Sequence, residues 1–336
     1  MDPISHVVFG YAVVRATRPP VWRLAVAAGI AALAPDVDAV FMLCGWDIYL
    51  RIHEIGTHAL VGTAPVALAV AVAVRGRSRA PIGSLFLAAW LATLSHLALD
   101  TLSGARIRLA WPFIEGRSVV PLASMAEPWL IAIFAVSVLA LAVSRLRRRT
   151  TARCVLAVLT LFFGLKMVWL VQSMRTLGPA APAAVEARII EARWFTLREW
   201  HVFERSPTRL SHVIVTPGRP PILVESWPRT ADTLLIARSR RLDTVRNLLA
   251  VHELTFAREQ PGARGQTDVL WSDIRFCWSP SGASANDAAD GPLVLGPAPT
   301  RIACGLWFGG TYDQAGRALI QRVQVLGRWQ TRPTRP

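Results

Sequence analysis

Residues 80–99 read APIGSLFLAAWLATLSHLAL, a run of 20 residues without Asp, Glu, Lys or Arg. An α-helix needs roughly 20 predominantly apolar residues to cross the hydrocarbon core of a bilayer, with about 17 as a lower limit. This stretch therefore predicts a transmembrane helix. The number of times the chain crosses the membrane depends on how many similar stretches it contains.

Other stretches on both sides are of the same kind. Residues 59–74 and 128–144 carry no charged side chain, and residues 154–174 carry only Lys166. Residues 24–43 are also long enough, but Pro35 interrupts them, and proline disfavours a helical conformation in the residue before it. With a short half-helix at residues 4–14, we predict an all-α polytopic membrane bundle of about five spans over residues 1–175.

The composition changes after this bundle. Residues 176–184 contain Gly178, Pro179 and Pro182 and are interpreted as a linker. Residues 185–336 resemble a small, strand-rich α+β soluble domain. We expect a helix at residues 241–252 and strands within residues 189–204, 213–215, 222–225, 233–237, 269–278 and 306–325.

The net charge of +15 raises the question of nucleic-acid binding. The distribution argues against it, because many arginines lie in short loops between the apolar runs. If the chain crosses back and forth, residues 15–23, 75–80 and 145–153 share one side and hold eleven arginines, whereas residues 44–57 and 103–126 hold four. The positive-inside rule makes the first side cytoplasmic and puts residues 185–336 outside the cytoplasm. The first 14 residues have no signal-peptide pattern.

Histidines and aspartates recur near the predicted outer ends of these helices. Ionisable groups at membrane depth cost several kcal/mol unless they are paired, hydrated or metal-bound. His96 and Asp100 are four residues apart and share a helix face, whereas Asp36 and Asp38 converge only if the backbone is not α-helical there. The predicted ligand set suits one or two divalent ions, Zn²⁺ above all: His6, Asp36, Asp38, His53, His58, His96 and Asp100.

Each piece of this set also has a simpler interpretation. His96 and Asp100 alone would be a hydrogen-bonded pair, Asp36 a helix cap, and His6 an interfacial residue. Glu54, between two predicted ligands, is either a general base or a further ligand. The remaining groups are interpreted as loop or supporting charges (Asp47, Glu115 and Glu127) or as surface and packing residues without partners (His201, His212 and His252).

The combined pattern resembles a known family. It comprises His6…Gly10, APDVD at residues 34–38, His53…Gly56-Thr57-His58, Leu94-Ser95-His96…Asp100 and Trp111-Pro112-Phe113. It is similar to the YdjM-like inner-membrane metal-dependent hydrolases over roughly residues 1–172. Glu54 stands where that family usually has arginine, and Ala59 where it usually has serine.

The resemblance implies a bacterial inner-membrane protein with a helical fold, distantly similar to zinc-dependent phospholipase C and P1 nuclease. Carried over by position, it implies the same seven ligands. We therefore expect hydrolysis by a metal-activated water, with Glu54 or Asp38 taking the proton. A site near the membrane interface favours a lipid or lipid-linked phosphoester. The alternatives are a metal-ion or proton-coupled transporter, and a structural protein with a vestigial site.

Cys277 and Cys304 are the only cysteines of the predicted soluble domain and lie 27 positions apart. In an oxidising compartment they would form a disulfide. Closing a loop of this size stabilises a domain by roughly 3–4 kcal/mol in the chain-entropy model. Two buried thiols are the alternative, because cysteine is often a core residue.

Overall fold

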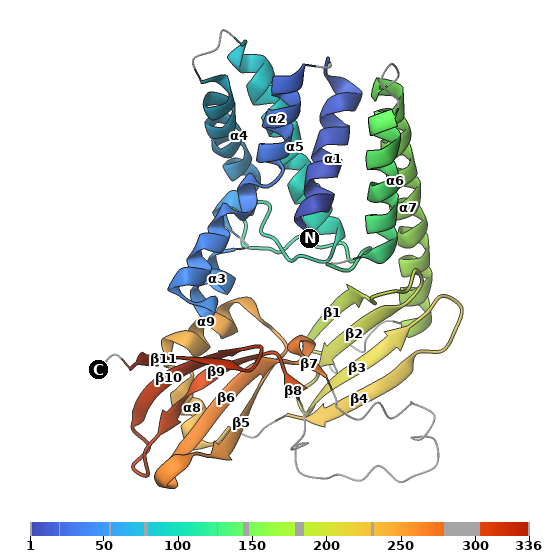
Figure 1. Cartoon of the computed structure of the whole chain (residues 1–336). Helices are drawn as coiled ribbons and strands as arrows, with labels where there is room; N and C mark the ends of the chain where they lie inside the picture. Colours follow the sequence, from blue (N-terminus) through green and yellow to red (C-terminus); the bar gives the residue numbers. More distant parts are fainter. Residues whose placement is uncertain are drawn as a thin grey trace.

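Figure 1 shows the computed structural model, in which a group of helices stands at one end and antiparallel sheets lie at the other. The structure describes residues 2–19, 21–53, 55–76, 80–125, 127–143, 148–178, 185–229, 232–278 and 303–334.

The N-terminal half is helical. Its elements are α1 (Pro3–Thr17), α2 (Trp22–Ala31), the 3-10 helix η1 (Ala34–Cys44), α3 (Trp46–Ile52), the 3-10 turn η2 (Gly56–His58), α4 (Leu60–Arg75), α5 (Ile82–Leu102), α6 (Pro128–Val143) and α7 (Arg148–Leu177). Helix α1 is longer than the predicted half-helix and has 15 residues. Asp2 caps it, because its carboxylate accepts the Ser5 backbone N–H at 2.9 Å.

Within the part of the chain that the structure describes, three helical segments are long and apolar enough to cross a membrane, namely Trp22–Cys44, Ile82–Leu102 and Arg149–Leu177. A fourth candidate is bent by 79° between Trp46–His58 and Leu60–Arg75. The predicted count of five is therefore not confirmed: helix α6 has only 16 residues. Large apolar side chains such as Leu139 and Leu161 are exposed on the outside of α6 and α7, as expected for helices solvated by lipid.

One ion pair lies in the interior of this bundle. The Lys166 Nζ atom on α7 is 3.1 Å from Glu127 Oε2, just before α6, and both side chains are almost completely buried. The same carboxylate oxygen accepts the backbone N–H of Ser124. Glu127 is therefore an internal partner of Lys166 and not the loop charge that the sequence indicated.

The C-terminal half contains two antiparallel sheets, in the orders β1-β2-β3-β4 and β11-β10-β9-β6-β5. The first comprises β1 (Ala187–Ala192), β2 (Trp200–Arg205), β3 (Arg209–Val215) and β4 (Ile222–Pro228). The second comprises β5 (Thr255–Pro261), β6 (Thr267–Asp273), β9 (Leu306–Tyr312), β10 (Ala318–Val325) and β11 (Arg328–Pro333). The remaining elements are α8 (Leu234–Ser239), α9 (Asp243–Val251), two short 3-10 turns and the strand pair β7 (Cys277–Trp278) and β8 (Ala303–Cys304).

Two sequence expectations are corrected in this half. Residues 234–237 belong to helix α8, where we expected a strand, and the Thr233 hydroxyl caps that helix by accepting the Ile236 N–H. Strands β5 and β11 were not predicted. The expected disulfide is confirmed, because Cys277 and Cys304 are bonded across β7 and β8. The predicted linker lies mostly outside the described residues.

The two halves are held together by buried polar contacts at α3. Asp47 accepts a hydrogen bond from Asn247 of α9 at 2.9 Å and pairs with Arg332 of β11 at 3.0 Å. Arg51 donates to the same Asn247 side chain. Asp47 is therefore a buried docking residue. A further contact between the halves joins β2 to the segment between α5 and α6, where the Trp200 indole N–H donates to the Pro121 carbonyl.

Candidate metal centre

Close packing of α1 against α5 brings His6 and His96 together. A Cβ atom on Gly10 would lie 3.0 Å from Ala32 Cβ and 3.2 Å from Ser95 Oγ, so glycine permits this approach. As a result the His6 and His96 rings stack with their centroids 3.8 Å apart.

Asp100 completes a group that we call the closed trio: His6, His96 and Asp100. Its Oδ1 atom is 3.2 Å from His6 Nε2, and its Oδ2 atom is 3.0 Å from His96 Nε2. The three side chains are at most 5% exposed. The spacing of four residues between His96 and Asp100 does place both on one helix face, as predicted.

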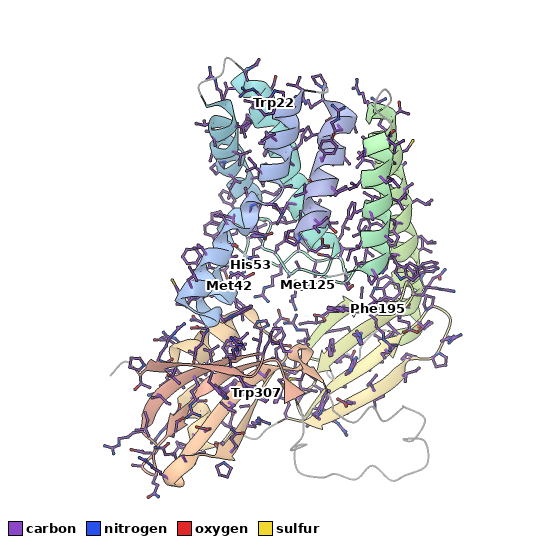
Figure 2. The ribbon with its side chains drawn as sticks, viewed as in Figure 1. Trp22, Met42, His53, Met125, Phe195 and Trp307 are labelled. Atoms are coloured by element: carbon purple, nitrogen blue, oxygen red, sulfur yellow. A yellow bond between two sulfur atoms is a disulfide. The ribbon has the colours of Figure 1, made fainter. Side chains whose placement is uncertain are left out.

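A second group, the open trio, consists of Asp36, His53 and His58. One ligand atom from each lies within 4.8 Å of the others. His58 is buried, whereas the Asp36 and His53 side chains are 33% and 30% exposed. Figure 2 shows His53 at the end of the helices that faces the sheets. The open trio is therefore the side of the cluster that a small molecule can reach.

The conformation of η1 explains how Asp36 and Asp38 both reach His58. A 3-10 helix turns by about 120° per residue, so residues two apart lie closer to one face than they do on an α-helix. Asp36 Oδ1 lies 3.4 Å from His58 Nε2, and Asp38 Oδ2 lies 3.3 Å from His58 Nδ1. The two carboxylates thus contact opposite nitrogens of one imidazole ring.

The two trios adjoin. His58 Nε2 is 3.3 Å from His96 Nε2 and 3.7 Å from Asp100 Oδ2. Asp36 Oδ1 is 3.6 Å from His96 Nε2. Six ligand side chains from four segments therefore meet in one cluster, which has enough donors for two ions.

Other contacts orient these ligands. His96 Nδ1 lies 2.7 Å from the Ala32 carbonyl and donates to it, which leaves Nε2 facing the cluster. Asp38 contacts the Nδ1 atoms of His53, at 2.9 Å, and of His58, and it accepts a hydrogen bond from Thr57. Metal-binding histidines commonly use the second ring nitrogen in this way. The contacts with the Ala32 carbonyl and the Thr57 hydroxyl were not predicted from the sequence.

The residues fit a divalent ion. His6 is completely buried, and among the residues that the structure describes neither of its ring nitrogens has a hydrogen-bond partner. Its Nε2 atom is near Asp100 without forming a hydrogen bond, as expected when both are ligands of one ion. Imidazole and carboxylate donors suit Zn²⁺ and other divalent transition-metal ions, so the ligand types do not identify the metal. Glu54 lies outside the described residues.

The three histidines of the C-terminal half are not partnerless, contrary to the sequence interpretation. His201 Nδ1 lies 2.7 Å from His212 Nε2. Burial lowers the pKa of each of these two rings to about 4, so both are neutral near pH 7. His252 Nδ1 contacts the Arg275 guanidinium and Asp273.

Gly62 controls how helix α4 meets the turn that carries His58. A Cβ atom at this position would lie 2.1 Å from the Gly56 carbonyl oxygen, a backbone atom. We expect Gly62→Ala to destabilise the protein by about 1–3 kcal/mol and to reduce its metal content, because the turn must shift. Thermal unfolding and metal analysis measure both effects.

Gly164→Ala is the matched control, because no atom lies within 4 Å of a Cβ added there. It should leave both quantities nearly unchanged. Equal behaviour of the two variants would contradict the role assigned to Gly62.

The helices and the cluster together define a membrane protein with a potential His/Asp metal-binding site at one end of its bundle. The chain belongs to the YdjM inner membrane protein family, whose model matches residues 1–172. No curated protein and no solved structure matches the chain.

Proposed function

We propose that this protein is a membrane-bound, metal-dependent hydrolase that acts on a lipid or lipid-linked phosphoester. The observation that carries the proposal is the pairing of a closed trio with an open trio. A fully enclosed set of ligands suits ion retention, whereas a partly exposed set leaves room for a substrate.

A bound divalent ion would supply Lewis acidity and lower the pKa of a coordinated water. The protein's own residues hold this chemistry in place. His6, His96 and Asp100 anchor the cluster, and Asp36, His53 and His58 border its open side. Asp38 fixes the rings of His53 and His58. The assignment of Asp38 or Glu54 as the proton acceptor stays a prediction.

The surroundings of the open side support a lipid substrate. Val37, between the two aspartates of η1, and Leu43, near its end, are 65% and 88% exposed. Met125 is also exposed, and Figure 2 shows it, like Met42 and His53, at the end of the helices that faces the sheets. Apolar side chains beside a cluster of metal ligands would contact the acyl chains of a substrate whose polar headgroup binds the metal.

The test is a hydrolysis screen on purified full-length protein reconstituted in lipid, with phosphatidic acid, lipid pyrophosphates and phosphodiester lipids as substrates. We expect phosphate or headgroup release that needs added Zn²⁺ or Mn²⁺ and that is absent from Asp100→Ala. Metal uptake into sealed liposomes without any hydrolysis would instead support the transporter alternative.

We further propose that the sheets lie outside the cytoplasm, on the strength of the arginine distribution. Cys44 ends η1, the element that carries Asp36, and residue 78 belongs to the arginine-rich stretch 75–80, for which the sequence predicts a cytoplasmic side. With Cys154 replaced by serine, Cys44 should react with an impermeant thiol reagent in intact cells. A Cys44→Ser, Ser78→Cys chain should be protected until the cells are opened. Reversed labelling would place the cluster on the cytoplasmic side.

A further inference from the structure

A cavity lies between the loop that follows α5 and the C-terminal half. Its volume is about 350 Å³. One wall is formed by Arg106, Arg108 and the segment 115–117, and the other by residues 249–253 at the end of α9. The backbone ties this loop to the metal centre, because Ala105 N–H donates to the Asp100 carbonyl and Leu60 N–H donates to the Leu109 carbonyl.

The charged side chains that line this cavity are three arginines, Arg106, Arg108 and Arg117, and two glutamates, Glu115 and Glu253. Arg106 pairs with Glu253 at 2.8 Å, and Arg117, which is 10% exposed, lies 3.9 Å from the same carboxylate oxygen. Arg108 forms no ion pair among the residues that the structure describes. Glu253 is 45% exposed, so a carboxylate from the C-terminal half reaches from the solvent edge to two enclosed guanidinium groups.

The cavity wall also carries unsatisfied N–H donors. The Nε atoms of Arg106 and Arg108 and the Nε2 atom of His252 are buried without a hydrogen-bond partner in the described part of the chain. His252 Nδ1 lies 2.7 Å from the Arg275 guanidinium, closer than the 3.3 Å to Asp273. Because a guanidinium only donates, Nδ1 accepts and Nε2 carries the hydrogen.

What these three groups lack is an acceptor. A buried donor without a partner is unfavourable, so three donors around one cavity, two on one wall and one on the other, indicate an acceptor-rich ligand. Arginine clusters bind phosphate through paired, charge-assisted hydrogen bonds. We propose that this cavity is a phosphate-binding site, and that Glu253 occupies part of it when phosphate is absent. It would hold the phosphate of a lipid headgroup or a free phosphate ion, and it does not depend on the hydrolase proposal.

The test measures phosphate binding and not turnover. Full-length protein in a phosphate-free detergent is titrated with inorganic phosphate while its unfolding midpoint is followed. The metal centre is removed as a competing site in two ways, by the Asp100→Ala substitution and by chelator treatment of wild-type protein. We expect the midpoint to rise with phosphate in both.

Three variants then locate the binding. Arg108→Gln should weaken it about tenfold or more, because one charge-assisted contact is lost. Arg246→Gln, the same change on an exposed arginine of α9, should leave it unchanged. Glu253→Gln should strengthen it, because a competing carboxylate loses its charge. This opposite sign is not produced by misfolding.

A parallel titration compares phosphatidic acid with diacylglycerol in the same detergent. Tighter binding of phosphatidic acid than of inorganic phosphate, lost in Arg108→Gln, identifies a lipid headgroup. Equal binding identifies free phosphate. The absence of any midpoint shift, or equal shifts in Arg108→Gln and Arg246→Gln, would overturn the site. So would phosphate binding that disappears once the metal centre is removed.

Discussion

Replacing His96 and Asp100 together by alanine is expected to remove nearly all bound metal from the purified protein. Both residues belong to the closed trio, and their loss leaves His6 as its only member. Changes to groups that merely support a ligand cost about 10–100-fold in metal affinity, so the loss of two direct ligands must cost more. Metal analysis after gel filtration, with stability measured in parallel, checks this.

His201→Ala is the matched control, since it removes a half-buried histidine of β2 that belongs to neither trio. Asp38→Asn tests whether Asp38 is a direct ligand or only orients other ligands. If Asp38 only orients His53 and His58, affinity should fall about 10–100-fold. If it is a direct ligand, the loss should equal that of Asp100→Asn. The same metal content in the double variant and in wild type would refute the centre.

Breaking the ion pair inside the bundle is the second change with a large expected effect. Removing one partner of a buried ion pair typically costs about 3–5 kcal/mol, because the other charge is left uncompensated. Lys166→Met and Glu127→Gln should each destabilise the protein by that amount, more severely in the apolar bundle than at a surface. Unfolding in mixed micelles, followed by tryptophan fluorescence, gives the differences.

The combined variant separates the pair from its individual residues. Lys166→Met with Glu127→Gln removes both charges together, so its stability should recover above that of either single variant. Arg246→Gln, which opens an exposed pair with Asp243, should have an effect of less than about 1 kcal/mol. Additive losses in the combined variant would mean that the two charges do not interact.

Much of the bundle was predictable because a long uncharged run has few alternatives to a spanning helix. The count of spans was not. Residues 46–75 form two helical segments bent by 79°, and α6 has 16 residues; the length of the apolar runs in the sequence does not reveal the bend. The helix α8 was mistaken for a strand because a short apolar run such as residues 234–237 has no decisive period.

The ligand types were visible because aspartate and histidine are rare at membrane depth. The contacts that distinguish one ligand from another were not predictable. Asp36 and Asp38 look equivalent in sequence, and only the 3-10 conformation shows that they face different nitrogens of His58. The arginines of the 103–117 loop were interpreted only as orienting charges. Their shared cavity depends on α9, about 140 residues later, which no local pattern reveals.

The docking of α3 onto α9 and β11 has a consequence for biosynthesis. Asp47 is separated from Asn247 by 200 positions and from Arg332 by 285. During translation the ribosome therefore releases the open trio long before the partners that hold its neighbouring helix exist. Until both sheets have folded, α3 and His53 at its C-terminal end lack these partners. Metal loading that needs a settled α3 would then be a late event, completed after membrane insertion.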